Sequence, residues 1–145
     1  MRIVLANDHG AVELSKEIAQ HLEKKGFEVN HLGVKEEKSV DYPDMAELAC
    51  KEYLQGNYDF GILCCGTGIG ISISANKIDG IRCALPQNIF AAKMAKEHNN
   101  VNFIAFGGRI DYQESPIDMI DAFIEDSFLG DRHLRRVNKI MSLEK

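Results

Sequence analysis

Apolar and polar residues follow one another along this chain in blocks that predict strands and helices in regular alternation. Short apolar runs bounded by polar residues or glycine are typical of buried parallel strands. Such runs cover residues 3–6, 27–32, 60–65, 81–85 and 101–106. Between them, apolar residues recur every three or four positions, which is the period of an amphipathic helix. The predicted helices cover residues 11–25, 41–55, 69–79, 88–98, 115–128 and 131–142.

This alternation predicts an α/β fold with three αβα layers, in which helices cover both faces of a five-stranded, doubly wound, mostly parallel, Rossmann-like sheet. The 145 residues are the size of one ordinary domain, with neither repeat nor linker, so we expect residues 1–145 to form a single domain. On the helix after residue 41 we expect Met45, Leu48, Ala49 and Tyr53 to be buried. On the helix after residue 115 we expect the apolar stripe to extend to Phe128. The charged stretch 34–40 is expected to be a surface loop.

Composition excludes several classes of function. The net charge of −5 argues against general nucleic-acid binding. The start of the chain lacks the pattern of a signal peptide, and no apolar run is long enough to predict a membrane span. We therefore expect a cytoplasmic protein whose partners include neither nucleic acid nor membrane.

The four cysteines, Cys50, Cys64, Cys65 and Cys83, lack the spacing of a zinc site. Cys64 and Cys65 are adjacent in a predicted strand, so their side chains point to opposite faces and are poorly placed to share a metal. We expect neither metal nor cofactor, and reduced cysteines. Cys50, Cys64 and Cys83 are expected to be small core residues.

The stretch from Cys65 to Gly70 carries the candidate chemistry. It joins a buried strand to a helix through glycines at alternate positions, Gly66, Gly68 and Gly70. Such a turn points backbone N–H groups at an anion, and a thiol beside a helix N-terminus tends toward the thiolate. Cys65 is thus a candidate base or nucleophile, with a tight turn around a core cysteine as the alternative. The stretch matches neither a Walker loop nor the dinucleotide-binding fingerprint.

Further candidates follow other strands or lie on helices, and each has a simpler alternative. Asp8 and His9 follow the first strand, where Asp8 is also a normal helix cap. Arg109 follows the fifth strand and is either a surface charge or a ligand contact. His98 ends a helix, where a histidine often serves only the helix dipole. Arg132 and Arg136 share one helix face, either as solvated charges or as a phosphate clamp.

A family resemblance extends over residues 3 to about 140. It rests on blocks in a fixed order: Asn7-Asp8-His9-Gly10, Asp41-Tyr42-Pro43, Cys65-Gly66-Thr67-Gly68-Ile69-Gly70-Ile71-Ser72, Glu97-His98-Asn99, Phe106-Gly107-Gly108-Arg109 and Gly130-Asp131-Arg132-His133-Leu134-Arg135-Arg136-Val137. The chain resembles the type B ribose-5-phosphate isomerases, a family that includes allose-6-phosphate isomerase and the subunits of galactose-6-phosphate isomerase. Asn7 stands where serine or cysteine is usual, and Ala11 where glycine or another small residue is usual.

The resemblance implies an aldose–ketose isomerase that interconverts ribose 5-phosphate and ribulose 5-phosphate in the pentose phosphate pathway, without metal or organic cofactor. It implies that Cys65 moves a proton between C1 and C2 through a cis-enediolate. Backbone N–H groups around Gly66, Gly68 and Gly70 would stabilise the enediolate oxygen. The remaining implied roles are ring opening for Thr67 and His98, hydroxyl proton transfer for Asp8, sugar contacts for Tyr42 and Asn99, and phosphate binding for His9, Arg109, Arg132 and Arg136.

The resemblance also implies a homodimer or homotetramer with active sites shared between chains. We expect Cys65, Asp8 and the arginine pair on one chain, with His98, Asn99 and Arg109 on its neighbour. The alternatives are an isomerase of allose 6-phosphate, galactose 6-phosphate or a tetrose phosphate, a nucleotide-binding regulatory module, and a non-catalytic phosphate-ligand-binding subunit. The nucleotide alternative lacks an acidic ribose-binding residue after the second strand, where Leu32-Gly33-Val34 stands.

Overall fold

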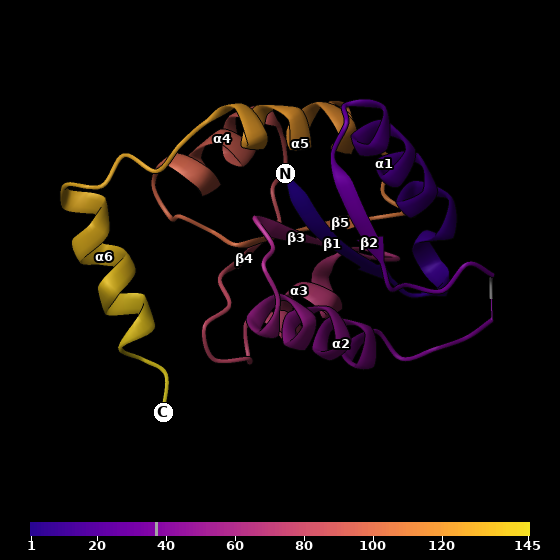
Figure 1. Cartoon of the computed structure of the whole chain (residues 1–145), viewed down its shortest axis with the longest axis horizontal. Helices are drawn as coiled ribbons and strands as arrows, with labels where there is room; N and C mark the ends of the chain where they lie inside the picture. Colours follow the sequence, from indigo (N-terminus) through magenta and orange to yellow (C-terminus); the bar gives the residue numbers. More distant parts are fainter. Residues whose placement is uncertain (37) are drawn as a thin grey trace.

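A parallel sheet with helices on both faces forms the body of the molecule (Figure 1). The computed structural model describes residues 1–36 and 38–145. The strands lie in the order β2-β1-β3-β5-β4, and each neighbouring pair is parallel. The strands are β1 (Arg2–Asn7), β2 (Glu28–His31), β3 (Phe60–Cys65), β4 (Cys83–Ala84) and β5 (Phe103–Gly107). The helices are η1 (His9–Ala11, 3₁₀), α1 (Val12–Lys24), α2 (Tyr42–Gln55), α3 (Ile69–Ala75), α4 (Ile89–Glu97), α5 (Pro116–Glu125) and α6 (Arg132–Met141).

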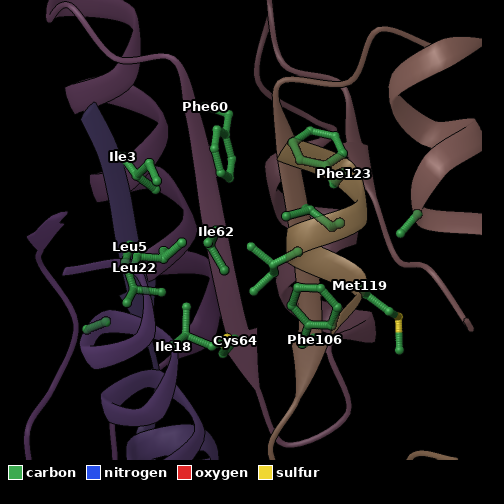
Figure 2. Packing of buried hydrophobic residues seen from close by; sticks show 14 of the residues in the cluster. Ile3, Leu5, Ile18, Leu22, Phe60, Ile62, Cys64, Phe106, Met119 and Phe123 are labelled. Atoms are coloured by element: carbon green, nitrogen blue, oxygen red, sulfur yellow. The ribbon is translucent and has the colours of Figure 1, made fainter. Parts of the chain in front are cut away.

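Two apolar layers hold the helices on the sheet. Helices α1, α4 and α5 pack on one face, where the rings of Phe60 and Phe123 meet edge to face with centroids 5.1 Å apart (Figure 2). Helices α2 and α3 pack on the other face, where Tyr53 meets Phe103 in the same way at 5.2 Å. Helices on both faces of an all-parallel sheet confirm the predicted three-layer, doubly wound fold.

Every residue of β3 is buried, as expected for the central strand of a sheet covered on both faces. Its side chains alternate, so that Cys64 lies in the layer under α1 and α5, and Cys65 lies in the layer under α2 and α3. The predicted opposite orientation of the two cysteines is confirmed. Gly61 leaves room for the ring of Phe103, which a side chain at that position would overlap.

Three predicted details are wrong, two on the longer helices α2 and α5 and one on the short helix α3. Leu48 is 45% exposed, because Ala46, Ala49 and Cys50 form the buried stripe of α2 and Leu48 falls beside it. Helix α5 ends at Glu125, so Phe128 lies beyond the helix.

The helix that starts at Ile69 ends at Ala75 instead of extending to residue 79. The hydroxyls of Ser72 and Ser74 donate to the carbonyls of Ile69 and Gly70, which competes with regular helix bonding. The chain then turns through Gly80 at a φ of +87°. Ile69 and Ile73 share one face of this short helix, and that face is exposed.

The predicted surface loop 34–40 is partly described. Residue 37 lies outside the described residues, and residues 34–36 and 38–40 form neither helix nor strand. Over the described ranges, no helix is long and apolar enough to cross a membrane.

Helix α6 stands apart from the layered body, at the side of the sheet where the strands begin (Figure 1). Its buried residues are His133 and Val137, whereas Leu134 and Ile140 are 48% and 43% exposed. The helix therefore presents most of its surface, apolar residues included, away from its own chain.

Candidate active site

The switch point of this sheet lies between β1 and β3. These strands are neighbours, yet α1 follows β1 onto one face and α3 follows β3 onto the other. The two connections diverge and leave a crevice at the carboxyl ends of the strands, where ligands of doubly wound proteins bind. Asp8 and Cys65 flank this crevice, and the N–H of Asp8 donates to the carbonyl of Cys64 at 3.1 Å.

Cys65 ends β3 and is only 4% exposed. The N–H of Gly68 donates to its Sγ at 3.1 Å, so a backbone dipole faces the sulfur. Gly68 adopts a φ of +79°, and a Cβ there would lie 2.8 Å from the carbonyl carbon of Phe106. This turn needs glycine for both reasons.

The other cysteines have different surroundings. Burial raises the pKa of Cys64 and of Cys50 to about 12 each, and burial also raises the pKa of Cys83. Cys64 is fully buried beneath α1 and α5. Of the adjacent pair, only Cys65 reaches the crevice.

One pocket of about 410 Å³ is lined by most of the residues predicted to contact the sugar. A tyrosine ring from the start of α2 forms its wall, since a Cβ at Gly70 would overlap the ring of Tyr42. The hydroxyl oxygen of Thr67 accepts the N–H of Ile69 at 3.2 Å, which leaves the hydroxyl proton available to a ligand. The lining residues are Asp8, Tyr42, Cys65, Gly66, Thr67, Ile69, Gly70 and Ile73.

An adjoining pocket of about 330 Å³ contains His9 and Arg109. The N–H of Arg109 donates to the carbonyl of Gly66 at 2.9 Å, and a Cβ at Gly66 would lie 3.4 Å from its Nη1. Nδ1 of His9 accepts the N–H of Val40 at 3.2 Å, so Nε2 is the nitrogen left for a ligand. The expected grouping of Arg109 with His98 is wrong, because Arg109 lies beside the glycine turn of its own chain.

His98 lies at the opposite end of the sheet, where the strands begin. It follows α4 and precedes the first residue of β5, whereas Cys65 pairs with Gly107, the last residue of β5. Strand β3 alone covers roughly 17 Å between these ends, at about 3.3 Å per residue. A small sugar phosphate cannot span that distance, so the structure does not bring Cys65 and His98 of one chain together.

The arginine pair accompanies His98. Helix α6 carries Arg132 and Arg136 on its exposed side, and its His133 stacks on His98 with ring centroids 4.1 Å apart. Nε2 of His133 is buried without a hydrogen-bond partner in the described chain. Burial lowers the pKa of His133, as do the nearby charges of His98, Arg132 and Arg136. The expected grouping of the arginine pair with Cys65 is therefore wrong.

Asn99 lines a separate hollow of about 680 Å³ beside α6, together with Arg82 and Met141. The predicted residues thus form two groups in one chain. The first, which we call the turn group, contains Asp8, His9, Tyr42, Cys65–Gly70 and Arg109. The second, which we call the α6 group, contains His98, Asn99, Arg132, His133 and Arg136.

Two residues that contact these groups carry no signal of a role in the sequence. His133 stands in a block quoted for the resemblance, but nothing in its spacing indicates that it packs on His98. Nothing in the sequence around His31 indicates a role, yet its Nε2 lies 2.8 Å from Oδ1 of Asn7, next to Asp8. Both contacts join segments that are distant in sequence, so no local pattern reports them.

Fold and pocket together define the class: a doubly wound parallel α/β protein with a small-molecule pocket at its switch point. The chain belongs to the Ribose/Galactose Isomerase family, whose model matches residues 3–140. It is 37% identical to ribose-5-phosphate isomerase B of Escherichia coli over 99% of this chain and 97% of that relative.

Solved structures agree with the family. Ribose-5-phosphate isomerase B of Clostridium thermocellum superposes with a TM-score of 0.94 at 42% identity, covering 99% of this chain and 97% of that one. The enzyme of Mycoplasma genitalium, solved with bound ribulose 5-phosphate, superposes with a TM-score of 0.90 at 37% identity, covering 98% of this chain and 95% of that one.

Proposed function

We propose that this chain is an aldose–ketose isomerase that interconverts ribose 5-phosphate and ribulose 5-phosphate. One observation carries the proposal: Cys65 shares a pocket with Asp8 while its sulfur faces the N–H of Gly68. The family supports it, since relatives named ribose-5-phosphate isomerase B match nearly the whole chain. No step of the proposed chemistry uses a metal or an organic cofactor.

In the proposed reaction, the thiolate of Cys65 takes the proton from C2 of the open-chain aldose. The electron pair of that C–H bond forms the C1–C2 double bond of a cis-enediolate, and the negative charge moves to the oxygen on C1. The sulfur then returns the proton to C1, while the hydroxyl proton on the C2 oxygen passes to the C1 oxygen by way of Asp8. The product is the ketose, with no net gain or loss of atoms.

Backbone N–H groups of the turn from Gly66 to Gly70 are the proposed donors to the enediolate oxygen. Each well-placed donor of this kind contributes roughly 2.7–4 kcal/mol to the transition state. Two N–H groups of the turn already have partners, since Gly68 donates to Cys65 and Ile69 donates to Thr67. When the sulfur takes the proton, the N–H of Gly68 would turn from the sulfur to the enediolate oxygen. One donor would thus stabilise first the thiolate and then the enediolate.

Ring opening and phosphate binding are proposed to use both groups of residues. Thr67 would donate its hydroxyl to the ring oxygen, and His98 would act on the sugar from the other side. His9 and Arg109 would meet the phosphate from the turn group, with Arg132 and Arg136 closing on it from the α6 group. Tyr42 and Asn99 would contact the sugar hydroxyls.

We further propose that the two groups come from different chains of a homodimer or homotetramer. The support is their separation within one chain, at opposite ends of the sheet. The exposed Ile69 and Ile73 at the pocket, and Leu134 and Ile140 on α6, offer apolar surface for such a contact. A two-fold axis would bring the α6 group of each chain to the turn group of the other.

A cytoplasmic location and a place in the pentose phosphate pathway remain part of the proposal. All four cysteines are free thiols, which suits a reducing compartment. The expectation that nucleic acid and membrane are not partners rests on the charge of −5 and on the sequence pattern.

The test is a panel of aldose phosphates with the purified protein, followed by ketose formation. We expect ribose 5-phosphate to give the highest kcat/KM, ahead of allose 6-phosphate, galactose 6-phosphate and a tetrose phosphate. Cys65→Ala should abolish turnover while leaving sugar-phosphate binding within about three-fold, because the sulfur acts mainly in the transition state.

Cys64→Ala is the matched control, since it removes the neighbouring thiol from the other face of β3. It should lower stability by loss of packing and keep most of the activity. Loss of turnover in a folded Cys64→Ala protein, with Cys65→Ala still active, would refute the proposed base. Binding without turnover across the whole panel would identify a non-catalytic subunit instead.

A further inference from the structure

Asn7 is a fully buried amide directly before Asp8, at the end of β1. Its Nδ2 donates to two carbonyl oxygens, that of Asp8 at 2.9 Å and that of Val34 at 3.0 Å. Its Oδ1 lies 2.8 Å from Nε2 of His31, at the end of β2. One side chain thus joins the segment that carries Asp8 to the segment that follows β2.

The partners fix the orientation of this amide. Carbonyl oxygens only accept hydrogen bonds, so the NH₂ group of Asn7 must face Asp8 and Val34. The oxygen of Asn7 therefore faces His31, and Nε2 of His31 must carry a proton to donate. Burial and the charge of Lys35 lower the pKa of His31, against a smaller opposite effect of Glu23. The neutral ring protonated on Nε2 supplies this donor, and so does the imidazolium.

Gly33 is shaped to admit this contact. A Cβ at Gly33 would overlap Oδ1 of Asn7. A side chain there would displace the amide from His31, so the glycine and the Asn7–His31 pair form one packed unit.

This unit holds Asp8 through the main-chain carbonyl of Asp8. The N–H of Asp8 donates to the carbonyl of Cys64 at 3.1 Å, and its carboxylate accepts the N–H of Gly10 at 2.8 Å. The carbonyl of Asp8 accepts two hydrogen bonds, the shorter from Asn7 at 2.9 Å and the longer from the N–H of Ala11 at 3.3 Å. Asp8, whose carboxylate lies in the pocket, is therefore held at its N–H, its carboxylate and its carbonyl.

The same unit holds one wall of the pocket. The segment after β2 is tied to Asn7 at Val34 and to His9 at Val40, on either side of Asp8 in sequence. It then leads into Tyr42, whose ring lies against Gly70. Loss of the Asn7 amide contact would leave Val34 held at this point by the longer bond from its own N–H to the carbonyl of Asn7, at 3.4 Å.

We infer that Asn7 and His31 are positioning residues that set the geometry of Asp8 and of the Tyr42 wall for the isomerisation. The inference rests on the proposed function, because it assigns a catalytic consequence to this contact. Neither residue lines the pocket, so both act through Asp8 and through Val34.

The test measures kcat and KM for ribose 5-phosphate in three variants. His31→Leu removes the donor, and a small displacement of Asp8 should lower kcat by about 10-fold to 100-fold. His31→Gln keeps an N–H donor at similar reach and should restore kcat to within about three-fold of wild type. Gly33→Ala perturbs the pair through Asn7 and should lower kcat as His31→Leu does. In His31→Leu and in Gly33→Ala, KM should change less than kcat.

Asn30→Ala is the matched control. Asn30 precedes His31 on β2, and its amide donates to the hydroxyl of Tyr58 at 2.7 Å, away from Asp8. It should lower the melting temperature about as His31→Leu does and leave kcat near wild type. This comparison separates positioning from general stability.

The outcomes distinguish the inference from the function beneath it. Wild-type turnover together with unchanged kcat in folded His31→Leu and Gly33→Ala proteins would overturn the inference alone. A His31→Gln protein as slow as His31→Leu would overturn it as well. A folded wild-type protein that isomerises no aldose phosphate would overturn the proposed function, and the inference with it.

Discussion

Two inactive variants of this protein should restore each other's activity when their chains are mixed. The first is Cys65→Ala, which removes the proposed base from the turn group. The second is His98→Ala, which removes the histidine stacked on His133 in the α6 group. If one site takes Cys65 from one chain and His98 from its partner, a mixed dimer has one site with both lesions and one intact site.

The size of the effect follows from the geometry. Cys65 lies opposite the last residue of β5 and His98 lies before its first, so one chain cannot supply both to one small sugar. With random pairing, half of the dimers are mixed and half of their sites are intact. Activity should therefore return to roughly a quarter of the wild-type value.

The assay unfolds the two variants together, refolds them and follows ketose formation from ribose 5-phosphate. Native mass spectrometry confirms that chains have exchanged. Cys65→Ala mixed with Asp8→Asn is the matched control, because both residues line the same pocket of one chain and no intact site can form. That mixture should stay inactive.

A third mixture tests the corrected grouping of Arg109. Cys65→Ala with Arg109→Ala should not recover, since Arg109 lies beside Gly66 of the same chain as Cys65. Recovery in this mixture would place Arg109 in the partner's site after all. No recovery of Cys65→Ala with His98→Ala, despite proven exchange, would refute the shared site itself.

Two further predictions concern charge. Arg136→Ala should raise KM for the sugar phosphate by about 10-fold or more, as expected for loss of a charged hydrogen bond, and Arg132→Lys should not restore the wild-type KM because lysine cannot form the two-pronged contact. Steady-state kinetics measure both effects, and an unchanged KM in both variants would show that the arginines are solvated charges. Burial lowers the pKa of His31 and of His133 in the folded protein below the ordinary value of 6.5. The neutral imidazoles therefore favour the folded state above about pH 6.5, and this contribution to stability is lost as the pH falls through the lowered pKa values. Thermal unfolding should show the melting temperature falling between about pH 7 and pH 5, with a smaller fall in His31→Gln, and a rise on acidification would contradict this sign.

The sequence predicted the layers because hydrophobic period and glycine position are local signals. Strand β3 is the clearest case, since a bounded apolar run can be buried on both faces only at the centre of a sheet. Leu48 shows the limit of the same argument. An apolar residue near a helical stripe is counted with it until the partner surface is known, and here the sheet contacts the stripe from Ala46 to Cys50 instead.

The turn group was predictable for a further reason. The carboxyl ends of parallel strands meet on one side of the sheet, so topology alone brings Asp8 and Cys65 together. The same rule places Arg109 beside them, and the expectation that Arg109 lies with His98 set this rule aside. His98 and α6 follow no such rule, because their places depend on how the last helix packs. The contact of His31 with Asn7 was equally hidden, since it joins positions 24 apart in sequence through side-chain atoms.

Helix α6 also has a consequence for the local stability of the protein. A helix of ten residues is marginal in water by itself, and α6 gains the burial of only His133 and Val137 from its own chain. The free energy that opens α6 locally should therefore be far smaller than the free energy that unfolds the sheet. Binding of an anion by Arg132 and Arg136 would then require α6 to be folded. The measured affinity would include the free energy of folding this helix as well as the free energy of the contacts with the arginines.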